Sequence, residues 1–455
     1  MQQYGKNLTT GSVFKNVVFF SLPYLLSYFL QTLYGMADLF IIGQFEGVAS
    51  TTAVSIGSQV MHMITVMIVG LAMGTTVSIG QAVGAGDRKQ AARNIGNTAI
   101  LFLAVSVALT AALLCFVSPI VSVMSTPADA VGGTVSYLTI CFIGIPFITA
   151  YNIISSVFRG LGDSKSPMYF IAVACAANIV LDYLFIGALG LGPAGAALGT
   201  TLSQAVSVAV SLAVILKRKS IVLHKGDFRP QRPVMAKILK VGIPIAFQDG
   251  LIQIAFIIIT IIANQRGLND AAAVGIVEKV ISFLFLIPSS MLSTVSALGA
   301  QNIGAGKPDR AIRTLRYAVM LAVGFGVLAS VVVQFTAESI VALFTDPGTV
   351  DGAEVVRFGS QYIRGYIFDC IFAGIHFSFS GYFCACRKSG LSFLHNILAI
   401  ALVRVPGVYA TSQLFPETLF PMGLATAAGS LFSVVICLIA FALIRRRAGP
   451  VPAER

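Results

Sequence analysis

Charged residues are scarce in this chain, and their scarcity argues against a soluble globular protein. Only 11% of the 455 residues are charged, whereas 56% are hydrophobic, and the mean hydropathy is +0.88. Soluble domains usually have about 25% charged residues. The composition therefore favours a protein that crosses a lipid bilayer many times.

The motifs that would indicate an enzyme are also missing. None of the four histidines belongs to a His-Glu-x-x-His motif, and Cys384-x-Cys386 has no second cysteine pair near it. We therefore predict that the chain is not an enzyme, that it has no cofactor, and that Cys384 and Cys386 do not bind a metal. All seven cysteines fall in or beside apolar runs, which argues against disulfides.

Apolar runs long enough to cross a bilayer core of about 30 Å recur along the whole chain. Runs this long and this continuously apolar exclude the alternating strands of a membrane barrel. They predict an all-α membrane protein with twelve transmembrane helices. The predicted spans are 15–43, 51–80, 95–118, 134–158, 167–190, 194–216, 236–262, 271–300, 315–336, 358–385, 390–412 and 420–444. The first span has no clear cleavage site for a signal peptide, so we expect it to be retained.

Most of the 30 lysines and arginines lie in alternate loops. The densest group is the stretch 217–240, which also contains Pro230 and Pro233. The positive-inside rule then predicts that the basic loops and both termini are cytoplasmic and that the protein lies in the cytoplasmic membrane. The net charge of +12 thus reflects topology, and we expect no nucleic-acid partner.

The chain is internally duplicated. Residues 81–86 (Gln-Ala-Val-Gly-Ala-Gly) recur as residues 301–306 (Gln-Asn-Ile-Gly-Ala-Gly), and Pro23 matches Pro244. No strand is expected before these glycines and no Gly-Lys-Ser/Thr follows, so they indicate tight turns rather than a phosphate loop. The repeat predicts two six-helix bundles of the kind found in many carriers. The predicted parts are an N-terminal lobe at 1–216, a cytoplasmic linker at 217–234 and a C-terminal lobe at 235–455.

Two carboxylates lie inside predicted spans of the first half. An ionisable group at mid-membrane costs several kcal/mol, so its presence favours a functional role. Asp38 shares one helical face with Ser27, Gln31 and Tyr34, because these residues are three or four positions apart. Asp182 likewise shares a face with Asn178, four residues earlier.

Such a pair of carboxyls can hold a proton, or it can bind a small hard cation if neutral oxygens complete the shell. Asn178 and Thr200 can supply those oxygens. We therefore predict an ion site, for a proton or for Na⁺, at Asp38, Asn178, Asp182 and Thr200.

The second half carries different charges. Arg404 stands at about the position that matches Asp182, and Asp249, Glu278 and Asp369 are further buried candidates. We expect Asp369 and Arg404 to form an ion pair between neighbouring helices. Paired charges that lock helix packing explain these residues as well as a functional role does, so both interpretations stay open.

Taken together, these features resemble the MATE family, the multidrug and toxic compound extrusion transporters. The resemblance covers nearly the whole chain. It rests on the 6+6 helix plan, Pro23, Tyr34–Asp38, the paired turns, Phe158–Asp163, and Asn178-x-x-x-Asp182.

The resemblance implies a V-shaped pair of lobes and an alternating-access antiporter that exports organic, often cationic, compounds against inward proton or sodium flow. It implies that Asp38, Asn178, Asp182 and Thr200 form the ion site. It also implies that Pro23 marks a bend in the first helix, with Tyr34 in the same network; we add Gln31 from the stripe described above. The partners would be the lipid bilayer and small amphipathic substrates, and we expect a monomer.

A related activity remains as an alternative. Flippases of lipid-linked saccharide precursors belong to the same superfamily, but they usually have a more basic central cavity, whereas the charges of the N-terminal half are acidic. An intramembrane enzyme or a channel would need a catalytic cluster or a filter motif, which the sequence does not supply.

Overall fold

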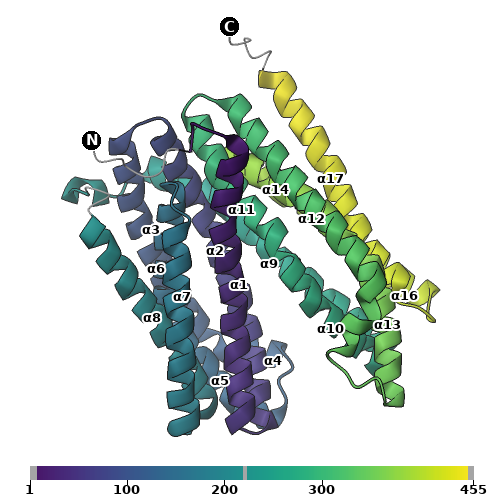
Figure 1. Cartoon of the computed structure of the whole chain (residues 1–455). Coiled ribbons are helices and arrows are strands. Elements are labelled where there is room, and N and C mark those ends of the chain that lie inside the picture. Colours follow the sequence, from purple (N-terminus) through teal and green to yellow (C-terminus); the bar gives the residue numbers. More distant parts are fainter. Residues whose placement is uncertain (1–7, 219–222, 449–455) are drawn as a thin grey trace. The chain divides into compact units, whose positions relative to one another are not determined.

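The computed structural model describes residues 8–218 and 223–448, and every regular element within them is a helix (Figure 1). The prediction of an all-α protein is therefore confirmed. Residues 1–7, 219–222 and 449–455 lie outside the described residues. They include both chain ends, which were predicted to be cytoplasmic, and part of the predicted linker 217–234.

The first half contains eight α-helices and one π-helical segment. They are α1 (Val13–Phe45), α2 (Val48–Gly84), α3 (Arg88–Cys115), α4 (Val117–Val123), α5 (Ala128–Ile143), α6 (Ile145–Gly160), α7 (Lys165–Asp182), the π-helix η1 (Tyr183–Ala188) and α8 (Gly192–Arg218).

The rest of the chain begins with a short 3₁₀-helix. The elements are η2 (Lys225–Phe228), α9 (Arg232–Arg266), α10 (Leu268–Leu284), α11 (Leu286–Gly304), α12 (Pro308–Ala342), α13 (Val350–Tyr366), α14 (Asp369–Ala385), α15 (Ser389–Ala399), the π-helix η3 (Ile400–Arg404), α16 (Val405–Leu414) and α17 (Phe420–Ala448).

The described residues contain ten helical segments that are long and apolar enough to cross a membrane. Two further spans are bent pairs, α5–α6 at 48° and α13–α14 at 40°. With each pair taken as one span the total is twelve, which confirms the predicted number. Both bends fall inside predicted single runs, because hydropathy reports apolar length and not helix direction.

Helix α1 has one apolar face exposed and one face buried. The exposed residues recur at spacings of three and four, which keeps them on a single side of a helix. They are Phe19, Leu22, Leu26, Phe29, Leu33, Met36 and Phe40. The other face buries Ser27 and Asp38. Lipid can cover the exposed stripe, whereas the polar stripe predicted from the sequence is directed into the protein.

The chain packs as two compact units. One comprises the described residues up to Ala246 together with Ala300–Arg310, and the other comprises Phe247–Gly299 and the chain from Ala311 onward. The first unit thus takes in the beginning of α9 and the second Gly-Ala-Gly turn. The predicted lobe boundaries at 216 and 235 follow the sequence repeat and stay a prediction.

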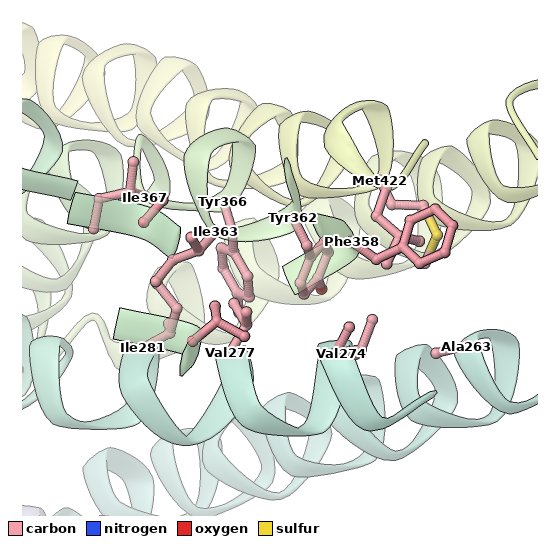
Figure 2. Close-up of a cluster of buried hydrophobic side chains, with 14 of the residues drawn as sticks. Ala263, Val274, Val277, Ile281, Phe358, Tyr362, Ile363, Tyr366, Ile367 and Met422 are labelled. Atoms are coloured by element: carbon pink, nitrogen blue, oxygen red, sulfur yellow. The ribbon is translucent and has the colours of Figure 1, made fainter. Parts of the chain in front are cut away.

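Each unit has its own apolar core. In the first unit, α1, α2, α5 and α8 contribute buried residues that include Ile42, Val54, Leu138 and Ala197. Figure 2 shows the core of the second unit, where side chains of α10 such as Val277 and Ile281 face those of α13. Because these apolar cores fix the helices within each unit, they also fix the polar side chains that lie between those helices.

The two Gly-Ala-Gly turns pack against each other within the first unit. Gly86 and Gly306 have φ of 72° and 71°, a backbone conformation that favours glycine. A Cβ at Gly84 would overlap the Gln301 carbonyl, and a Cβ at Gly304 would overlap the Gln81 carbonyl. The glycines therefore act as the sequence predicted, by letting the chain turn and the backbones approach.

Gly304→Ala is expected to lower the melting temperature of the purified protein, because the new methyl group must push two backbones apart. Such overpacking costs roughly 1–3 kcal/mol. Gly324→Ala is the matched control, because Gly324 of α12 has open space around it. Equal melting temperatures for both variants would show that the close approach of the turns contributes nothing to stability.

Candidate functional site

A buried polar cluster lies where α1, α7 and α8 pack on one another. Figure 1 shows α1 (purple) and α7 (teal) running side by side. Asp38 is 2% exposed, and Asn178 and Asp182 are 0% exposed. The Asp38 carboxyl lies close to Asp182 and Asn178 of α7 and to Thr200 of α8. The structure thus brings together all four residues that the sequence predicted for the ion site.

Thr200 connects α8 to α1. Its Oγ1 donates a hydrogen bond to Asp38 Oδ2 at 3.0 Å. The hydroxyl group of Tyr34 in turn donates to the Thr200 carbonyl oxygen at 2.9 Å and lies 2.8 Å from Ser203 Oγ. Tyr34 therefore fixes the turn of α8 that carries Thr200, as expected of a residue in the same network.

Several polar atoms of the cluster remain unpaired. Within the described part of the chain, Asp38 Oδ1, both carboxyl oxygens of Asp182 and the Asn178 side-chain amide have no hydrogen-bond partner. Buried polar atoms without partners are costly, since they have lost water and gained nothing in exchange. Four oxygens of this kind, three from the two carboxyls and one from the amide, suit a proton or a small hard cation.

The approach of Asp182 to α8 depends on Gly199. A Cβ at this position would overlap Asp182 Oδ1. The π-helix η1 begins directly after Asp182, and π-helical turns within longer helices are frequent at functional sites. Neither feature was predicted, because the first depends on how closely α7 packs against α8 and the second leaves no clear signal in the composition.

Pro23 and Gln31 lie further along α1. Pro23 is buried within α1, which continues as one helix across it. Proline lacks the N–H that would bond to the carbonyl four residues earlier, so it weakens the helix at this point. Gln31 lies near Tyr151 of α6.

In the second unit, Asp369 and Arg404 form the predicted ion pair. Arg404 Nη2 lies 2.8 Å from Asp369 Oδ2 and donates a second hydrogen bond to Ser430 Oγ at 2.9 Å. Asp369 is 0% exposed. The pair joins α14 to the π-helix η3 and to α17.

The other two acidic candidates have separate partners. Glu278 is half-buried and accepts a hydrogen bond from Thr260 Oγ1 at 3.2 Å. Asp249 is also half-buried and accepts a longer one from Gln248 Nε2 at 3.4 Å. Among the described residues, no hydrogen bond or ion pair joins Asp249 or Glu278 to Asp369, so these three acids do not form one cluster like that of the first unit.

Comparison with known proteins places the chain in a family. The MatE family model matches residues 23–184 and 244–410, one segment in each repeat and together more than half of the chain. The chain belongs to the MATE family of transporters. This confirms the resemblance seen in the sequence, and it confirms the prediction of a transporter rather than an enzyme.

Named relatives and solved structures agree with this assignment. The chain is 29% identical over 431 residues to the "Probable multidrug resistance protein YpnP" of Bacillus subtilis, with 95% of both chains covered. It is 26% identical to the "Multidrug export protein MepA" of Staphylococcus haemolyticus, with 90% of this chain and 89% of the relative covered. A solved outward-facing multidrug resistance MATE transporter matches its fold with a TM-score of 0.88 at 22% identity, over 98% of each chain.

Proposed function

We propose that this MATE transporter is an antiporter that exports organic, often cationic, compounds in exchange for protons or Na⁺. The observation that carries the proposal is the pair Asp38–Asp182, two buried carboxyls that lie close to each other on membrane-spanning helices. Two buried negative groups side by side repel each other unless a positive ion joins them. The site is therefore suited to bind the coupling ion.

The substrate class is supported by the relatives. YpnP and MepA carry names that refer to multidrug resistance and multidrug export. Neither name favours the alternative of a lipid-linked saccharide flippase, and the acidic character of the first-unit site speaks against a polyanionic substrate. We therefore propose small amphipathic organic compounds as substrates.

The proposed cycle couples charge to the packing of α1. A proton or Na⁺ that enters from outside binds at Asp38 and Asp182 and removes their repulsion. Helix α1, which is weakened at Pro23, then changes its packing against α7 and α8, and the substrate is released. Release of the ion to the cytoplasm resets the helices. The ion can drive this change only because its affinity differs between the two arrangements.

The orientation completes the proposal. The basic loops and both termini face the cytoplasm, the protein lies in the cytoplasmic membrane, and it acts as a monomer. The positive-inside distribution of lysine and arginine supports the first two points.

The experiment that tests the function is efflux from whole cells. Cells that express the protein should expel preloaded ethidium, an organic cation, faster than cells with an empty vector, and collapse of the ion gradients should abolish the difference. A second assay uses vesicles that contain the protein and a fluorescent lipid-linked saccharide, and it measures transport of the saccharide across the membrane. Transport of the saccharide without efflux of ethidium or of any other organic compound in a panel would overturn the proposal.

Thr200→Val is expected to weaken the apparent affinity for the coupling ion while the maximal rate of transport is largely kept. Valine matches the shape of threonine but cannot donate to Asp38, and loss of a supporting hydrogen bond usually costs about 10–100-fold in ion affinity. The measurement is transport rate against ion concentration. Thr200→Ser keeps the hydroxyl group and is the control; equal ion affinity in both variants would remove Thr200 from the site.

A further inference from the structure

The position that corresponds to Asp182 in the second unit has the opposite charge. Lys165–Ser166 at the start of α7 recurs as Lys388–Ser389 at the start of α15. Counted from these lysines, Asp182 and Arg404 differ in position by one residue. A π-helix adjoins each of them, since η1 begins after Asp182 and η3 ends at Arg404.

The surroundings of Arg404 repeat those of Asp182. A Cβ at Gly429 of α17 would lie 2.8 Å from Arg404 Cβ, so this glycine makes room for Arg404 as Gly199 does for its neighbour in the first unit. In both units a hydroxyl residue follows the glycine. Thr200 donates to a carboxylate, whereas Ser430 accepts from the guanidinium of Arg404.

The second unit also lacks a carboxylate at the α9 position that matches Asp38. The alignment of Pro23 with Pro244 places Ile259 there, and Ile259 is 1% exposed in the apolar core. The negative charge comes instead from Asp369 of α14, which the guanidinium neutralises at 2.8 Å. The first unit therefore has two carboxyls and needs a positive ion, whereas the second has one carboxyl and its own fixed cation.

We propose that the Arg404 guanidinium is a built-in cation that occupies the second unit's counterpart of the ion site. This inference rests on the proposed function of the first-unit site. Because the guanidinium is covalently held, it does not leave during the cycle, and the second unit stays in its ion-loaded arrangement. Ion exchange is thereby restricted to Asp38 and Asp182, and one coupling site acts in each transport cycle.

The oxygens near Arg404 suggest what would replace it. Within the part of the chain that the structure describes, Asp369 Oδ1 and the hydroxyl groups of Tyr362 and Tyr366 are buried without a hydrogen-bond partner. Both tyrosines lie near Asp369 and Arg404. Without the guanidinium, these oxygens and Ser430 Oγ form a donor set for a small hard cation. Removal of Arg404 should therefore make the second unit dependent on an added cation.

The test uses the full-length purified protein and its melting temperature in a series of sodium concentrations, with choline to hold ionic strength constant, and in a separate pH series. The melting temperature of the wild type should rise with the concentration of the coupling cation, and Asp38→Asn should abolish this rise. Asp38→Asn combined with Arg404→Met should regain such a rise. A triple variant that also carries Asp369→Asn should lose the rise in melting temperature again.

Two results would overturn the inference. One is a rise that persists in Asp38→Asn and disappears when Asp369→Asn is added, because the second unit would then already exchange cations. The other is the absence of a rise in a folded Asp38→Asn/Arg404→Met protein. If that protein does not fold, two measurements on the wild type test the inference instead. One is the number of radioactive Na⁺ ions bound per chain, and the other is the number of protons released per chain when substrate is added. One ion per chain supports the inference, and a second ion that is lost in Asp369→Asn contradicts it.

These outcomes are distinct from failure of the proposed function. If the first-unit site does not bind the coupling ion, either the wild type shows no cation-dependent rise in melting temperature, or Asp38→Asn keeps that rise whether or not Asp369 is replaced. If only the inference about Arg404 is wrong, the rise in Asp38→Asn depends on Asp369.

Discussion

Asp38→Asn should reduce ethidium efflux from preloaded cells to the level of the empty vector. The amide has nearly the same shape as the carboxyl, but it carries no charge and does not take up a proton, so Asp182 alone remains to balance the charge of a cation. The repulsion that the ion would relieve is then absent in every state of the cycle, so the ion gradient no longer favours one arrangement of α1. The measurement is efflux rate, together with the amount of protein in the membrane.

Thr32→Val is the matched control for this variant. Thr32 also lies on α1, but its hydroxyl group bonds to the Tyr28 carbonyl of its own helix at 3.1 Å. We expect efflux close to that of the wild type. If Asp38→Asn inserted normally and expelled ethidium as fast as this control, the carboxyl at Asp38 would have no part in coupling.

Gly199→Ala should cause a comparable loss of efflux through a single methyl group. The added carbon would overlap Asp182 Oδ1, so the Asp182 carboxyl must rotate away from Asp38 or α8 must move away from α7. Either change separates the two carboxyls that hold the ion, and small displacements of reacting or binding groups are costly in rate. Ion-dependent transport in proteoliposomes should fall to a few per cent of the wild-type rate, with an increased requirement for the coupling ion.

Gly132→Ala of α5 is the control, because it adds the same methyl group to a helix of the same unit where nothing lies within 4 Å. Its transport should equal that of the wild type. Equal transport by Gly199→Ala would show that the contact of Asp182 with α8 is not needed for coupling.

The parts of this architecture that depend on the length of the apolar runs could be predicted from the sequence. Twelve hydrophobic runs predicted twelve spans, because every helix that crosses a bilayer must be long and apolar whatever its neighbours are. The grouping of Asp38 with Asp182 was also accessible. Both carboxyls are too costly to leave in lipid, and each belongs to a polar stripe with helical spacing that must be directed inward.

Features that depend on contacts between helices could not be predicted from the sequence. The role of Gly199 requires knowledge of how close α7 comes to α8, and glycine is common in membrane helices for many reasons. The π-helices η1 and η3 differ from ordinary helix by one residue per turn and leave no clear composition signal. The bends in α5–α6 and α13–α14 likewise leave the apolar runs unbroken.

The repeat was most informative where its copies differ. Their shared turns pack the first Gly-Ala-Gly segment on the second, whereas Asp182 and Arg404 give corresponding positions opposite charge. The pairing of Arg404 with Asp369 at 2.8 Å was predicted, but the parallel between Gly199 and Gly429 emerged only from the structure. This parallel supports the proposal that Arg404 takes the place of a bound cation in the second unit.

The central claim is that an ion bound at Asp38 and Asp182 drives substrate exchange, and counterflow in proteoliposomes tests it most directly. Purified protein is reconstituted with ethidium inside, and a sodium gradient and then a pH gradient are imposed separately. One of the two gradients should drive ethidium movement by the wild type, and neither should drive it in Asp38→Asn. Ethidium movement in Asp38→Asn at the wild-type rate, or movement in the wild type that responds to neither gradient, would contradict the account.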